Sequence, residues 1–110
     1  ILTLDEASSM VTMLDHPAAR TIFDVKSATT EGRSLEQLIR EHADIIAHVH
    51  ANDANRRGPG FGDTDFAPIL QTLRSIGYDG YVSVEVFDYS PDPETIARES
   101  LRYLKECAAR

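Results

Sequence analysis

Three residues with metal-binding side chains, Asp24, His50 and Glu85, are spread along the chain. Carboxylate oxygens and imidazole nitrogens are ligands that Mn²⁺, Mg²⁺, Co²⁺ and Zn²⁺ accept in proteins. A buried carboxylate without a cation or a hydrogen-bond donor is costly, and a divalent ion would offset that cost for both acids. Whether the three residues form a site depends on the elements that carry them.

Each of these residues stands near the carboxyl end of a short segment typical of a β-strand. The segments are Thr21–Val25, Ile45–Ala51 and Tyr81–Phe87, all rich in β-branched or apolar residues. Between them lie stretches with apolar residues at helical spacing, opened by capping residues or a helix-starting proline: Thr3, Ser34, Asp65 and Pro93. The order helix–strand–helix–strand–helix–strand–helix predicts a parallel α/β fold with right-handed crossovers.

Side chains alternate across a strand, which predicts the two faces of each one. This alternation places Asp24, His50 and Glu85 on one face. Ile46 and His48 belong to the same face as His50. The opposite faces are mainly apolar and suited to packing under helices; they carry Thr21, Phe23 and Val25, then Ala47, Val49 and Ala51, then Val82, Val84 and Val86.

Two architectures fit this order, a doubly wound open sheet and a (β/α)₈ barrel, and both place active sites at the carboxyl ends of their strands. Three ligand-type residues at successive strand ends therefore indicate a metal site. A single acid or histidine at such an end is more often a structural residue, so the pattern alone leaves both interpretations open.

The loop from Asn52 to about Thr64 follows the second strand and would roof the same end. Arg56 on this loop could bind hydroxyl, carboxylate or phosphate oxygens of a ligand. We interpret the loop glycines as positions that need positive φ, because Pro59 removes a donor and no Lys-Ser/Thr pair follows to complete a phosphate cradle. Ser27, shortly after Asp24, could line the site or begin a loop.

Composition narrows the classes of protein. The 110 residues carry a formal net charge of −7, which argues against a binder of nucleic-acid backbones. No apolar run approaches the roughly 20 residues of a membrane span. The lone cysteine, Cys107, excludes an internal disulfide framework and a CxxC site, so we expect a cytoplasmic enzyme or binding domain.

Several stretches together resemble the sugar phosphate isomerase/epimerase superfamily of xylose isomerase-like barrels, and most of all its ketose 3-epimerase (tagatose/psicose epimerase) branch. They are His48–Arg56, Gly58–Gly62, Asp65–Phe66, Gly77–Gly80 and Val82–Glu85. The resemblance implies that residues 1–110 are the C-terminal part of a (β/α)₈ TIM barrel, from helix 5 to helix 8 with strands 6–8. A whole barrel needs about 250 residues, so the 110 residues of this sequence are too few for one.

The resemblance also implies roles for individual residues. Asp24, His50 and Glu85 match the metal ligands at the ends of strands 6, 7 and 8, and Glu85 also matches a proton-transferring residue. Arg56 matches the substrate-contacting arginine. Ser27 stands where many members have a substrate-contacting histidine, and the first ligand, a glutamate of strand 4, would lie upstream of this sequence.

The implied activity is epimerisation or isomerisation of a ketose or a related hydroxy-carbonyl sugar through an enediolate. We expect a divalent metal cofactor, first Mn²⁺, and a small-molecule sugar as partner, with no nucleic acid and no membrane. A homo-oligomer of the full-length protein is also expected. Two alternatives stand beside this hypothesis: an endonuclease-IV-like metal-dependent phosphodiesterase, and a non-catalytic barrel fragment.

Overall fold

Side-chain caps determine where the long helices begin. In the computed structural model, which describes residues 2–110, each long helix follows a residue whose side chain accepts a hydrogen bond from a first-turn N–H group. These residues are Thr3 before α1 (Leu4–Leu14), Ser34 before α3 (Leu35–Glu41), Asp65 before α4 (Phe66–Ser75) and Asp92 before α5 (Pro93–Ala108). The helix starts predicted from the sequence are confirmed.

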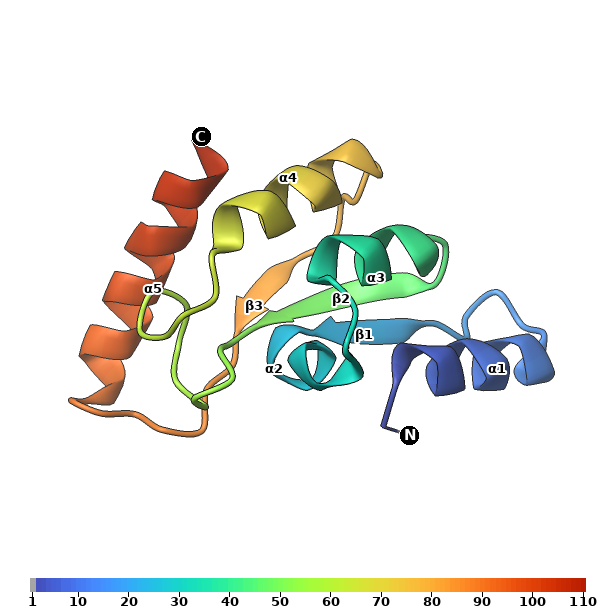
Figure 1. Cartoon of the computed structure of the whole chain (residues 1–110), viewed down its shortest axis with the longest axis horizontal. Helices are drawn as coiled ribbons and strands as arrows, with labels where there is room; N and C mark the ends of the chain where they lie inside the picture. Colours follow the sequence, from blue (N-terminus) through green and yellow to red (C-terminus); the bar gives the residue numbers. More distant parts are fainter. Residues whose placement is uncertain (1) are drawn as a thin grey trace.

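Three parallel strands form one sheet in the order β1-β2-β3. Their bounds are Thr21–Asp24, Ile46–Ala51 and Val82–Val84. Each strand is joined to the next through helical segments, and Figure 1 shows α4 lying between α3 and α5 along the sheet. This arrangement confirms the parallel α/β class and matches part of a barrel.

The core lies between the sheet and these helices. Phe23 of β1 and Val49 of β2 are fully buried and pack with Leu38, Ile39 and Ile69 from the helices. Burial of one such side chain is worth about 1.5–3 kcal/mol relative to exposure. On the opposite face of the sheet, His48 and His50 are only partly buried and Ile22 is exposed.

A β-bulge at Ala47 corrects the predicted faces of β2. Thr21 pairs with Ile46 but Ile22 pairs with His48, so Ala47 has no partner in β1. The extra residue interrupts the alternation of side chains. As a result Ile46 is buried in the core, whereas Ala47 is exposed, the reverse of the prediction. Beyond the bulge, the alternation that places His50 is as predicted.

All three strands are shorter than the sequence indicates, β2 by the single residue Ile45. Val25, predicted as the end of a strand, begins the short helix α2 (Val25–Ala28), which continues into the 3₁₀ turn η1 (Thr29–Glu31). The carboxylate of Asp24 caps α2 by accepting the N–H of Ser27 at 2.9 Å. β3 ends at Val84, which leaves Glu85 at the first position after the strand.

The longest helix, α5, shows how the helices divide between core and solvent. Its buried residues include Ile96, Leu104 and Cys107, and the thiol of Cys107 is not in a disulfide. Its outer face carries i,i+4 ion pairs such as that between Arg98 and Glu94. Among residues 2–110, no helix combines the length and the apolar character that crossing a membrane requires.

Candidate metal centre

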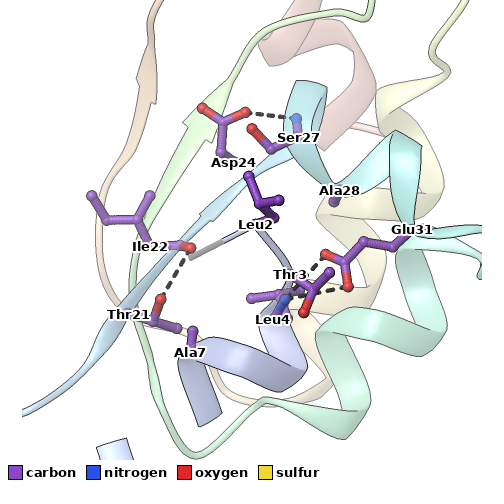
Figure 2. Close-up of a pocket in the computed structure, with 10 residues that line it drawn as sticks. All are labelled: Leu2, Thr3, Leu4, Ala7, Thr21, Ile22, Asp24, Ser27, Ala28 and Glu31. Atoms are coloured by element: carbon purple, nitrogen blue, oxygen red, sulfur yellow. Dashed lines mark hydrogen bonds between the residues drawn. The ribbon is translucent and has the colours of Figure 1, made fainter. Parts of the chain in front are cut away.

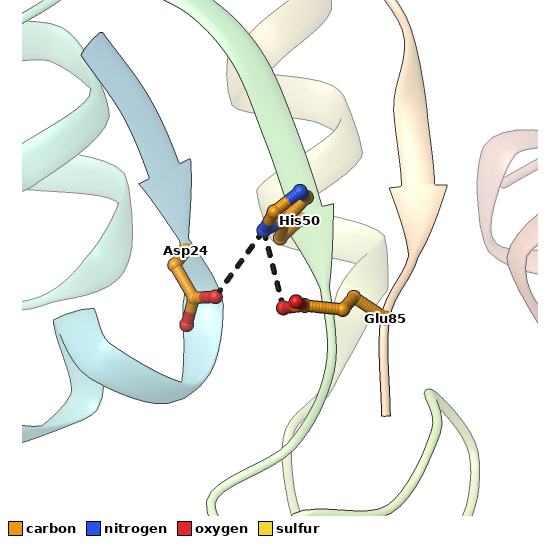
Figure 3. A group of neighbouring side chains, drawn as sticks. All are labelled: Asp24, His50 and Glu85. Carbon is orange, nitrogen blue, oxygen red and sulfur yellow. Dashed lines mark ion pairs between the residues drawn. The ribbon is translucent and has the colours of Figure 1, made fainter. Parts of the chain in front are cut away.

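The carboxyl ends of the three strands bring Asp24, His50 and Glu85 together (Figure 3). Nδ1 of His50 lies 3.5 Å from Oδ2 of Asp24 and 3.2 Å from Oε2 of Glu85. Strand register explains the contact: Asp24 pairs directly with His50, and the N–H of Glu85 donates to the carbonyl of Ala51 at 3.2 Å. The structure thus unites the three residues that the sequence analysis selected.

The spacing of the three groups fits a divalent cation. One ligand atom from each residue lies within 4.8 Å of the other two. Ligand atoms about 2.0–2.2 Å from an ion are at most about 4.4 Å apart, so small side-chain rotations are sufficient. All three residues are partly exposed, which leaves room for ligands from water or a substrate.

The carboxylate of Asp24 is held at both oxygens. Oδ1 accepts the N–H of Ser27, and Oδ2 accepts the side-chain amide of Asn52 at 3.1 Å. Burial raises the pKa of Asp24, but the hydrogen bonds from Ser27 and Asn52 outweigh it, so the pKa lies below its usual value. Asp24 is therefore an oriented anion at neutral pH. Asn52 was not among the site residues predicted from the sequence.

A cavity of about 180 Å³ lies beside Asp24, between β1, α2 and the start of α1 (Figure 2). Ser27 stands at its edge next to Asp24, and the carboxylate of Glu31 accepts the N–H of Leu4 at 3.2 Å within it. The lining residues are Leu2, Thr3, Leu4, Ala7, Thr21, Ile22, Asp24, Ser27, Ala28 and Glu31. Ser27 is exposed, so its predicted contact with substrate is sterically open.

Arg56 lies over the segment that follows β3. Its backbone has a φ of +71°, and its carbonyl oxygen accepts the N–H groups of Phe87 at 2.9 Å and Asp88 at 3.0 Å. The guanidinium carbon lies 5.5 Å from the centre of the Phe87 ring, and Nζ of Lys26 lies 5.2 Å from the same centre. The charged groups of Arg56 and Lys26 thus both lie near the ring of Phe87, which follows Glu85 by two residues.

The glycines of this loop serve two purposes. Gly60 has a φ of +89°, as predicted for the loop. Gly58 and Gly62 are needed for close approach instead, because a Cβ at Gly58 would collide with the side chain of Ser100 and one at Gly62 would lie 2.5 Å from Cγ of Asp53. The prediction of positive φ is therefore right for Gly60 only.

Parallel strands joined by helices, with polar side chains gathered at the carboxyl ends, define a segment of a (β/α) barrel. The chain belongs to the xylose isomerase-like TIM barrel family, whose model matches residues 1–107. This confirms the resemblance on which the residue roles were based.

Two of the chain's relatives are named as sugar epimerases. It is 33% identical over 107 residues to 3-dehydro-D-guloside 4-epimerase of Escherichia coli, covering 97% of this chain and 41% of that protein. It is 31% identical over 87 residues to D-psicose 3-epimerase of Ruminiclostridium cellulolyticum, covering 79% of this chain and 30% of the relative. The chain therefore spans less than half of the length of these relatives.

A solved structure gives the same picture. The crystal structure of apo 3-keto-D-glucoside 4-epimerase from E. coli superimposes with a TM-score of 0.90 at 33% identity, covering 97% of this chain and 41% of that chain. The fold is thus that of a partial xylose isomerase-like barrel.

Proposed function

We propose that this chain supplies the metal-binding strand ends of a sugar epimerase or isomerase. The observation that carries the proposal is the convergence of Asp24, His50 and Glu85 from three strand ends in a chain of this family. The names of the two epimerase relatives support the reaction class. Because the chain spans about two fifths of the first relative, a fourth ligand and a second proton-transferring acid are proposed to come from another part of a complete barrel.

The donor set suits Mn²⁺ first, with Mg²⁺, Co²⁺ or Zn²⁺ as substitutes. When bound, the ion would act as a Lewis acid that acidifies a C–H bond next to the sugar carbonyl. Asp24, held at both oxygens, and His50 would hold the ion. Glu85, whose side chain is partly exposed, would also take the proton from the carbon next to the carbonyl, which leaves an enediolate, or return a proton to that enediolate.

Two further residues are proposed to contact the sugar. Arg56 presents a guanidinium above Phe87 at the same end of the sheet, and a guanidinium suits hydroxyl or carbonyl oxygens. Ser27, at the edge of the cavity beside Asp24, offers a hydroxyl. Ser27 replaces a histidine found in many ketose 3-epimerases, so we propose that it changes which sugar is accepted.

The wider setting belongs to the same proposal. Residues 1–110 would form the C-terminal part of one barrel domain, in a cytoplasmic protein that forms homo-oligomers. The net charge of −7 supports a small sugar over a nucleic acid as the partner.

The proposal is tested by titrating Mn²⁺ into the 110-residue chain in a calorimeter. We expect one ion per chain, with binding lost in the Asp24→Ala variant and kept in the Asp63→Ala variant, a matched acid on the loop after β2. A chain that binds no Mn²⁺ would favour the non-catalytic alternative. For the reaction, the metal-loaded complete barrel is incubated with ketoses in deuterated water; failure to exchange the hydrogen next to the carbonyl would contradict the proposed class.

A further inference from the structure

Asn52, the first residue after β2, is fully buried, and both ends of its side-chain amide are occupied. Its Nδ2 donates to Oδ2 of Asp24 at 3.1 Å, and its Oδ1 accepts the backbone N–H of Lys26 at 2.7 Å. The amide therefore bridges the end of β2 to the residues on either side of the β1–α2 junction.

The direction of these bonds matters for the carboxylate. An ionised carboxylate has two oxygens with about four lone-pair positions in total. Ser27 takes one position on Oδ1, and Asn52 takes one on Oδ2, the oxygen that lies 3.5 Å from Nδ1 of His50. With both oxygens held, the carboxylate cannot rotate freely, and a free position of Oδ2 remains beside His50.

We infer that Asn52 is a positioning residue that orients Asp24 as a metal ligand. This inference rests on the proposed metal site. Hydrogen-bond partners behind a ligand fix its orientation, and their removal typically weakens metal binding by about 10–100-fold. Without the amide, the Asp24 carboxylate would turn away from His50 in a fraction of molecules, and the ion would bind fewer ligands at once.

The neighbouring residue provides a matched control. Asp53 is also buried and starts the same loop, but its carboxylate accepts the N–H of Ala54 and both the N–H and the hydroxyl of Thr64. Among residues 2–110, none of the hydrogen bonds of this carboxylate reaches a proposed ligand. Loss of Asp53 should loosen the loop without disturbing the orientation of Asp24.

The first experiment compares Mn²⁺ affinity by calorimetry in the wild-type chain, Asn52→Ala and Asp53→Ala, with thermal melts of the metal-free proteins. We expect about 10–100-fold weaker binding for Asn52→Ala and less than about twofold for Asp53→Ala. Equal weakening in both variants, or unchanged affinity in Asn52→Ala, would overturn the inference alone. A wild-type chain that binds no Mn²⁺ would overturn it together with the proposed function.

A second measurement needs no variant. Saturating Mg²⁺ is expected to shift the side-chain amide signals of Asn52 in the NMR spectrum of the wild-type chain, because its acceptor becomes a ligand. Asn55 is the internal reference, since its amide donates to the carbonyl of Phe61 at 2.9 Å and not to a proposed ligand. Signals of Asn52 that stay as constant as those of Asn55 would contradict the inference, whatever the stability of the variants.

Discussion

Oε2 of Glu85 lies 3.2 Å from Nδ1 of His50, although the two residues come from the ends of different strands. The same nitrogen lies 3.5 Å from Oδ2 of Asp24, so two carboxylates compete for one imidazole nitrogen. One N–H group cannot satisfy both oxygens fully. A cation among the three groups would replace this competition by ligand bonds. Adding the metal should therefore raise the free energy of unfolding.

Mn²⁺ is expected to stabilise the folded chain through His50. A ligand at 100 times its Kd adds about 2.7 kcal/mol to the free energy of unfolding. The gain should disappear in the His50→Ala variant and persist in His16→Ala, a matched change at an exposed histidine away from the cluster. Urea denaturation with Mn²⁺ and with EDTA measures it; equal stabilisation of both variants would show that the ion binds elsewhere.

Glu85→Gln is expected to separate catalysis from folding in the complete, metal-loaded barrel. The amide keeps the size of the side chain but cannot accept a proton, and loss of a general base typically costs about 10²–10⁴-fold in rate. Deuterium exchange into the sugar measures the loss, with metal content determined in parallel. The control is Glu99→Gln on the solvent face of α5. Exchange at the wild-type rate would remove Glu85 from the mechanism.

Asp5 is expected to make the free energy of unfolding depend on pH in the acid range. Arg33 donates to its Oδ2 at 3.0 Å, and this hydrogen bond, with a smaller one from His42, lowers the pKa of Asp5. A lowered folded-state pKa stabilises the protein above the unfolded value of about 3.9, and the contribution is lost as pH falls through the folded pKa. Asp5→Asn should thus be less stable than wild type at pH 7 and match it near about pH 2.

Urea denaturation at the two pH values tests this prediction. Asp79→Asn, at an exposed residue, removes the same charge without an ion pair among residues 2–110. The prediction fails if the stability difference between Asp5→Asn and wild type is as large at acid pH as at neutral pH.

Gly60→Ala is expected to be more destabilising than Gly77→Ala. Both glycines have positive φ, +89° and +76°, and a left-handed conformation costs an L-residue about 1–2 kcal/mol. A Cβ at Gly60 would also lie 2.9 Å from Cγ of Tyr103, whereas one at Gly77 would meet nothing within 4 Å. The free energies of unfolding of the two variants test this; equal losses would show that Tyr103 moves aside at no cost.

The sequence was sufficient to predict the main arrangement of the site. Period-2 alternation and the convergence of parallel strand ends were enough to predict that Asp24, His50 and Glu85 lie together. Their roles as ligands stay a prediction. Helix caps such as Ser34 and Asp65 could also be predicted from the sequence, because a cap bonds to N–H groups only a few residues away.

What escaped prediction depends on contacts between distant residues. Ala47 looks like any small strand residue, and only the pairing with β1 shows that it is bulged. Val25 is β-branched and favours a strand, but the cap from Asp24 starts a helix there. Asn52 looks like a loop residue until the fold places its amide against Asp24, 28 positions earlier.

The carbonyl of Arg56 connects two loops that are distant in sequence. It accepts hydrogen bonds from the N–H groups of Phe87 and Asp88, and so joins the loop after β2 to the segment that follows Glu85. The proposed sugar-contacting residue Arg56 and the proposed base Glu85 therefore lie on two segments that these hydrogen bonds hold together.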